Sequence, residues 1–464
     1  MPKFAKRFLI AAAVIVAALA LILLCVNLYL QSGGVQQRIR DTASKALGTE
    51  VTIRSTTYTP WEGLVLRGIS IPDSTTPNIN VVEAAALRIR FALAPLLQQR
   101  FVVTECALFE PKLIVRQLEN GDWLIPFPRR AAEPPPAPPE VPSAPKVKGP
   151  SFKAELQRFR LGAGQIIFIN AKNRTVLLLE KSDIDATIAP DLTAKGTVSI
   201  GRMNVGGVLK PHKVGGPFTW DGKVFDLPEI QGSLAGGRLS GKFHLENGEA
   251  PTYTLATRLD GVLLKRLADE AGIEPGKTDG RLNGSLDLAG DPRNTDSLAG
   301  KAHFELIEAK LKPIELISKL GELLQINELQ LLKLSEARAD LTIGNDRVQL
   351  DDVFLKSENL ILTGQGPIRF NGKLKVEARL LINNKLQQQL KGILGNNFVE
   401  SENPDYRQLP FTVSGKVDSP KTDLLDKLTG INLGQDVGGL LQNLFRAVPQ
   451  QKPAPEDKKS APAN

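Results

Sequence analysis

Histidine is the first place to look for chemistry, because its imidazole serves both proton transfer and metal binding near neutral pH. The chain has three histidines, His212, His244 and His303. None of them has a cysteine, histidine or carboxylate partner at the spacing of a metal-binding motif. His244 and His303 fall at alternating positions of expected strands and are interpreted as ordinary sheet residues. The sequence therefore predicts no metal site.

Two short motifs resemble catalytic signatures without meeting their requirements. Residues 272–278 (GIEPGKT) place three residues between two glycines, whereas a phosphate-binding loop needs four and follows an apolar strand. Ser143 and Lys146 fit the S-x-x-K pattern, but they lie in a proline-rich stretch with no rigid scaffold to hold a nucleophile. We interpret the first motif as a polar turn and the second as part of a linker.

Paired carboxylates could exchange protons with a substrate if they shared one face of a strand. Asp351 and Asp352 are adjacent at the start of an expected strand, so their side chains point to opposite faces. The nucleophile elbow G-x-S-x-G does not occur. The sequence predicts that the protein is not an enzyme and needs no cofactor. A hydrolase with catalytic residues scattered along the chain remains the open alternative.

The chain is organised around an uncharged N-terminal stretch, Phe8–Leu30. At 1.5 Å per residue, a helix of this stretch is about 35 Å long and can cross a hydrocarbon core of ~30 Å. Lys3, Lys6 and Arg7 precede it, and positive charge favours leaving that end in the cytoplasm. We expect a single-pass anchor with its N-terminus in the cytoplasm and the rest of the chain exported.

A cleaved signal peptide and a buried soluble helix are the alternatives to this anchor. A signal peptide has a shorter apolar region, of about 7–15 residues, and a small-residue cleavage site. The stretch is longer than that, and the sequence LYLQSGG around its end contains no such site. An uncleaved anchor is the better interpretation.

Composition favours a β-rich structure outside the anchor. Apolar residues make up 42% of the chain but aromatic residues only 5%, and Gly (40) and Pro (32) separate short bursts of Val, Ile, Leu and Thr. The net charge is +8, yet the basic residues are interleaved with acidic ones. Because neither a basic run nor aromatic stacking platforms occur, we expect no nucleic-acid partner. A mildly basic surface suits an anionic membrane.

The pattern along the chain predicts six segments. A helix is expected over Val35–Leu47, ended by Gly48, and alternating strands follow. The proline-rich stretch 131–150 is expected to be an extended linker between β-rich units, or an excursion from one continuous sheet. Further helices are expected over 262–271, 314–334 and 385–398. The segments are an anchor (1–34), an N-terminal β region (35–130), the linker (131–150), a second β region (151–423), an amphipathic helix (424–448) and a disordered tail (449–464).

Both β regions resemble AsmA-like proteins. In the first, the step Leu93–Leu97 leads to a strand, Pro111–Val115 begins the next strand, and Asn120–Trp123 forms a Gly-x-Trp turn. In the second, Leu360–Gly366 and Leu409–Pro420 repeat the alternating Gly and apolar positions of that family. The resemblance covers roughly 1–130 and 230–425. The chain differs from larger members in its size and in its proline-rich linker.

The resemblance implies a fold, a place and a function. It implies a mainly β protein with few helices, in which an N-terminal transmembrane helix precedes a long, curved, largely antiparallel sheet forming an apolar groove. It implies that this helix is a single-pass anchor in the inner membrane, with the N-terminus in the cytoplasm and the bulk of the chain in the periplasm. It also implies a bridge-like protein that moves phospholipid, or another acyl-chain lipid, between inner and outer membranes during outer-membrane biogenesis. An outer-membrane or envelope protein would be its partner.

The sequence also allows a second function and a second architecture. A structural or chaperone-like protein that assists outer-membrane protein assembly is the alternative function. The same alternating strands could also hide their apolar face in a sandwich. The sequence does not identify which residues line the groove, nor whether the groove continues across the linker.

Overall fold

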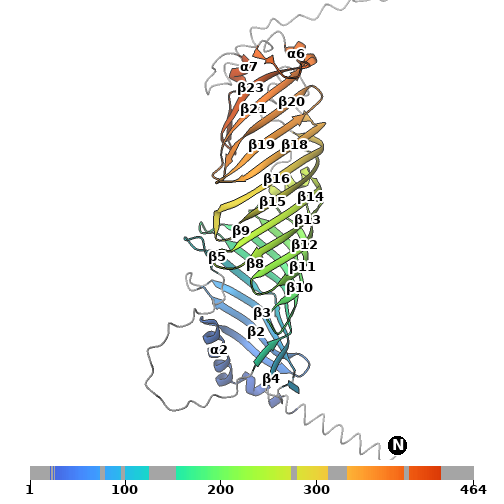
Figure 1. Cartoon of the computed structure of the whole chain (residues 1–464). Helices are drawn as coiled ribbons and strands as arrows, with labels where there is room; N and C mark the ends of the chain where they lie inside the picture. The colour runs from blue at the N-terminus through green and yellow to red at the C-terminus, as the bar shows by residue number, and fades with distance from the viewer. Residues whose placement is uncertain are drawn as a thin grey trace, which may run out of the picture.

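The computed structural model describes most of the chain between the N-terminal stretch and the C-terminal tail. The described residues are 21, 24–25, 27–73, 79–92, 94–95, 100–124, 153–272, 279–311, 332–390, 397–417 and 419–429. Within them the protein is mainly β, and every strand belongs to one long mixed sheet. Figure 1 shows this sheet as an elongated, twisted ribbon with α2 near one end and α6 and α7 at the other.

The N-terminal part of the sheet is an antiparallel meander. It consists of β1 (Thr52–Thr59), β2 (Gly63–Pro72), β3 (Asn80–Phe91), β4 (Arg100–Phe109), β5 (Lys112–Gln117) and β6 (Trp123–Leu124). Both β4 and β5 pair with β3 in one register, with Phe109 opposite Ala86 and Lys112 opposite Glu83. They are therefore one long strand, interrupted at Glu110 and Pro111.

Parallel pairing carries the sheet across the proline-rich segment. Strands β7 (Lys153–Leu156) and β8 (Arg158–Ile169) lie beside β4 and β5 and run in the same direction. The register is unbroken from Arg100 opposite Lys153 to Arg116 opposite Ile169. The described strands of the two β regions expected from the sequence thus belong to one continuous sheet, and residues 131–150 lie outside the described residues.

From β8 onward the described strands form an antiparallel meander to the C-terminal end. In chain order they are β9 (Thr175–Ile188), β10 (Ala194–Val205), β11 (His212–Trp220), β12 (Val224–Leu234), β13 (Gly237–Glu246), β14 (Thr252–Leu263), β15 (Asp279–Asp291), β16 (Asn294–Leu311), β17 (Leu332–Lys333), β18 (Glu336–Gly344), β19 (Arg347–Lys356), β20 (Leu360–Arg369), β21 (Lys373–Asn383), β22 (Val399–Glu400), β23 (Tyr406–Lys416) and β24 (Ser419–Thr422). Each long strand pairs with the next long strand in the chain.

A row of irregular residues bends the first half of the sheet. Gly68, Glu110, Ala163 and Lys181 lie in β2, between β4 and β5, in β8 and in β9, and all have positive φ. Irregular residues of this kind change which side chains of a strand face each way, and at this row the strand register shifts only between β8 and β9. Before this row one alternating set of positions in each strand carries the apolar side chains, and after it the other set does. The irregular residues keep both sets on the same face of the sheet.

Helices cover the ends of that apolar face. α2 (Gly33–Leu47) packs Ile39, Ala43 and Leu47 on a cluster that includes Leu66 and Ile71, and Gly48 ends the helix at φ 63°. At the far end, α6 (Asn384–Leu390) and α7 (Leu424–Thr429) contribute Leu386, Leu424 and Leu428 to the largest buried cluster. Between these ends, α3 (Leu264–Ala271) packs Leu267 beside Leu234 and Val262.

Several predicted helices can be compared with these elements. The predictions over Val35–Leu47 and 262–271 are confirmed, although Val262 and Leu263 still belong to β14. The predictions over 385–398 and 424–448 hold for α6 and α7, and residues 391–396 and 430–464 lie outside the described residues. The predicted helix 314–334 also lies largely outside them, but its last part is wrong, because Leu332–Lys333 is strand β17.

The predicted anchor Phe8–Leu30 falls mostly outside the described residues, as do Lys3, Lys6 and Arg7. No helix among the residues that the structure describes has both the length and the apolar composition to span a membrane. Residues 27–31 are helical, and Leu21, Leu24 and Leu28 are 55–61% exposed.

Candidate functional site

The two faces of the sheet differ in chemistry, and the strand register shows it directly. On one face Leu286 of β15 stands opposite Ala302 of β16, and Ala302 stands opposite Leu341 of β18. On the other face the neighbouring residues pair Asp287 with Lys301. Residues directly opposite each other share a face, so this alternation separates an apolar side from a charged side.

The apolar side, called the inner face below, runs through the whole described sheet. Its members are linked by cross-strand pairing or by alternation along one strand: Leu66, Leu87, Leu108, Leu161, Ile184, Val198, Phe218, Leu227, Phe243, Leu255, Leu286, Ala302, Leu341, Val353, Leu362, Leu380 and Leu409.

Burial along the inner face changes from the ends to the middle. At one end, Leu66 belongs to the cluster that α2 covers. At the other end, Leu380 and Leu409 are buried under α6 and α7. In the middle, half-buried side chains such as Val198 and Leu286 lie among buried ones such as Phe218 and Leu227. Within the described residues no second sheet packs on this face, since all strands belong to the same sheet. An apolar strip therefore remains partly exposed along the centre of the molecule.

The opposite face is a solvated network of ion pairs. Arg158 donates to Asp185 at 2.6 Å, and Arg338 lies 2.5 Å from Glu336. The hydrogen bond from Arg158 is the main cause of the lowered pKa of the Asp185 carboxyl. Such exposed pairs keep the outer face soluble and contribute little to stability.

Two of the three histidines, His244 and His303, belong to this outer network. His244 lies 2.6 Å from Asp226, and His303 lies 2.7 Å from Asp340 and 3.2 Å from Glu305. Hydrogen bonding to Asp340 and then to Glu305 raises the pKa of His303. Three acidic, histidine or cysteine side chains do not converge anywhere in the described part of the chain in a way that could hold a metal ion.

Asp351 and Asp352 were expected on opposite faces of their strand, but both line one cavity beside a register shift between β18 and β19. Asp351 accepts a hydrogen bond from Thr342 at 2.6 Å, whereas Asp352 lies 3.5 Å from Arg338. Gly272 ends α3 at φ 73°, and 273–278 lie outside the described residues, as do Ser143 and Lys146.

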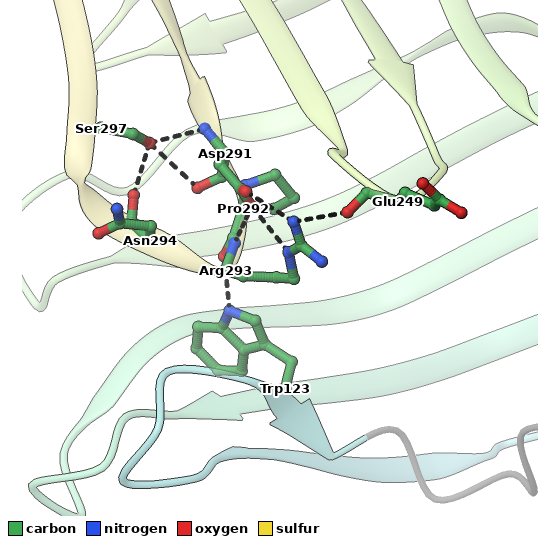
Figure 2. Close-up of polar contacts among 7 residues, drawn as sticks. All are labelled: Trp123, Glu249, Asp291, Pro292, Arg293, Asn294 and Ser297. Atoms are coloured by element: carbon green, nitrogen blue, oxygen red, sulfur yellow. Dashed lines mark hydrogen bonds and ion pairs between the residues drawn. The ribbon is translucent and has the colours of Figure 1, made fainter.

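A contact between distant segments closes over the inner face. The indole nitrogen of Trp123, in β6, donates a hydrogen bond to the carbonyl oxygen of Pro292, in the turn between β15 and β16, at 3.0 Å (Figure 2). Trp123 stands opposite Gln117, and its ring meets Phe168 edge-on at 5.7 Å. Because Phe168 is on the inner face, between Val115 and Leu177, the contact lies on the apolar side of the sheet.

The Pro292 turn is itself held rigidly. Arg293 donates to Asp291 at 2.9 Å and to the backbone oxygen of Glu249 at 3.1 Å, which ties the turn to the one between β13 and β14 (Figure 2). Ser297 donates to the backbone oxygen of Asn294 at 2.6 Å. We call the Trp123–Pro292 contact with these supporting bonds the rim clasp.

Sequence reasoning found the strands but not the site. The alternation of apolar residues identifies two faces in each strand, and a signal for the inner face was therefore present. At Glu110, Ala163 and Lys181 the inward-facing positions change from one alternating set to the other. The inner face therefore cannot be followed along a strand by counting every second residue. In the sequence Trp123 belongs only to a predicted turn, and nothing in the sequence points to Pro292 as its partner. Comparison of the chain with protein-family models, curated proteins and solved structures finds no match.

Proposed function

We propose that the protein binds phospholipid by its acyl chains along the inner face and carries it between the inner and outer membranes, as its resemblance to AsmA-like proteins implies. The observation that supports this most is the half-buried apolar strip through the middle of the sheet, with no second sheet over it in the described residues. Apolar side chains left in this state are stabilised by a partner that removes them from water.

Acyl chains suit this strip better than a folded protein partner. Burying each methylene group contributes about 0.8 kcal/mol, so a two-chain lipid gains substantial binding energy without any specific polar contact. A strip of uniform chemistry lets the lipid move along it, because no position binds much more tightly than the next. The charged outer face stays in water and needs no partner.

The N-terminal end of the sheet fits a position beside a bilayer. Asn27, at the end of the uncharged stretch, donates to the backbone oxygen of Tyr58 at 2.8 Å and accepts from its backbone nitrogen at 2.9 Å. The exposed Leu21, Leu24 and Leu28 precede this contact. In the proposal, the stretch Phe8–Leu30 anchors the chain in the inner membrane, and lipid enters the groove at the β1 end.

Site-specific photocrosslinking tests the proposal. A benzophenone amino acid at Leu286 reports on the inner face, and the same group at the neighbouring Asp287 reports on the outer face of the same strand. The full-length protein, purified in mild detergent from irradiated cells, should carry phospholipid at position 286 and not at 287 by mass spectrometry. Equal labelling at both positions, or none at 286 in a folded protein, would contradict lipid binding on this face.

A further inference from the structure

The two ends of the rim clasp belong to opposite rims of the sheet. β5 and β8 are parallel, and the strands after β8 alternate in direction. β5, β8, β10, β12 and β14 therefore end at one rim, and β9, β11, β13 and β15 end at the other. Trp123 follows β5 at the first rim, whereas Pro292 follows β15 at the second.

In a flat sheet these two points would be far apart. The path from β5 to β15 crosses β8 to β14 in eight steps between paired strands, and at about 4.8 Å a step this is roughly 40 Å. The observed hydrogen bond of 3.0 Å requires the intervening strands to curl until the rims meet. Since Trp123 lies on the inner face, they curl around that face.

The close approach between the β5–β6 turn and the Pro292 turn requires a glycine. Gly121 has φ 89°, and a β-carbon there would lie 2.6 Å from the backbone oxygen of Arg293. Only glycine therefore lets the β5–β6 turn approach so closely. Asp122 and Arg293 line one polar cavity of about 510 Å³ beside the clasp. The hydrogen bond to Asp291 is the main cause of the raised pKa of Arg293, and the charge of Asp122 adds to it.

We propose that the rim clasp is a gate on the lipid path. This inference rests on the proposed function, in which acyl chains lie on the inner face. A phospholipid has a polar headgroup that stays in water, so it must project between the two rims as the lipid moves. Where Trp123 meets Pro292 there is no opening between the rims. A headgroup passes this point only when the hydrogen bond between them breaks.

The energetics suit a contact that opens repeatedly. The single neutral hydrogen bond and the edge contact between the Trp123 and Phe168 rings each stabilise the closed state only weakly. Thermal motion breaks a contact of this strength often. The Arg293 bond to the backbone oxygen of Glu249 ties the Pro292 turn to the turn between β13 and β14, so in the proposal the Trp123 side moves away from it.

A reversible crosslink tests the gate in the full-length protein. The variant carries D122C and R293C in a background with C25A and C106A, reconstituted through its N-terminal end in vesicles of phosphatidylethanolamine and phosphatidylglycerol. A short bifunctional thiol reagent with a reducible centre locks the clasp. Photocrosslinking groups at Ile89 in β3, before the clasp, or at Val353 in β19, beyond it, report where lipid is present.

With the clasp locked, lipid adducts should persist at Ile89 and fall to background at Val353, and reduction of the reagent should restore them at Val353. The D122C variant alone, treated in the same way, cannot be bridged and should label both positions. Equal labelling of Val353 before and after reduction overturns the gate and leaves the proposed function standing. Absence of adducts at both positions in both states overturns the proposed function itself.

Discussion

On the inner face, glycines stand opposite aromatic rings of neighbouring strands. Gly196 of β10 pairs with Phe218 of β11, and Gly284 of β15 pairs with Phe304 of β16. The Phe304 ring lies against the backbone of Gly284, whereas a β-carbon at Gly196 would meet the backbone of Asp185 in β9. Glycine in these strands, which normally weakens a sheet, is thus explained by close packing.

Substitution at Gly284 should show this packing. In G284A the new β-carbon would lie 2.4 Å from the Phe304 ring and 2.7 Å from the backbone oxygen of His303, so the ring must leave its place. We expect a loss of about 1–3 kcal/mol in the free energy of unfolding, measured by urea denaturation. Gly248, with open space around it, is the matched control, and G248A should be close to neutral. Equal effects of the two variants would contradict this account.

The raised pKa of His303 predicts a pH dependence of stability. Protonated His303 bonds to Asp340 and Glu305, and this contribution is fully present below its unfolded pKa of about 6.5. It is lost as pH rises through the higher folded pKa. The side chain is 42% exposed, so the increment should stay below about 1 kcal/mol. Comparing the unfolding free energies of the wild type and H303Q should show a difference at pH 5.5 that vanishes at pH 9.

At the level of single elements, the helix before the sheet protects its first edge. β1 pairs only with β2 among the described strands, so its other side has free backbone groups that could join another chain. Arg40 donates to the backbone oxygen of Ile53 at 2.8 Å, and Ser44 accepts from the backbone nitrogen of Val51 at 2.9 Å. Asn27 caps Tyr58 further along. The helical segment thus takes the place of a neighbouring strand.

A charged residue on the buried side of α2 should detach the helix and expose the unpaired edge of β1. Ile39 packs against the apolar cluster of β1 to β3, whereas the neighbouring Gln37 is exposed. I39D should lower the free energy of unfolding by about 1–3 kcal/mol, because the carboxylate would be buried without a partner. It should also promote self-association through β1, which light scattering can measure. Q37D is the matched control, and a similar effect of both variants would rule out this role of α2.

For the whole molecule, the parallel pairing of β4 and β5 with β7 and β8 joins the two β regions. Every other long-strand pair in the described sheet is antiparallel. Two parallel neighbours require a crossover between them. The proline-rich segment 131–150 lies within this crossover, and the sheet itself bridges the junction.

The junction should therefore hold without a covalent link. Residues 1–140 and 141–464, expressed together as separate chains, should assemble through the parallel register between Arg100 and Arg116 and copurify in detergent. I114P removes a backbone donor in the middle of this register and should abolish assembly, because proline disrupts an internal strand. Failure of the unmodified pieces to associate, when each is soluble, would show that the linker is required to hold the sheet together.

The sequence by itself determined where most strands and the helices near 35–47 and 262–271 would form. Local alternation, helical spacing and terminal glycines carry that information, since they depend on residues only a few positions apart. The tertiary structure decided the rest: the parallel junction, the bulges that keep one face apolar, and the meeting of Trp123 with Pro292. Each of these depends on groups tens to more than a hundred residues apart, whose positions follow only from the accumulated twist of the whole sheet.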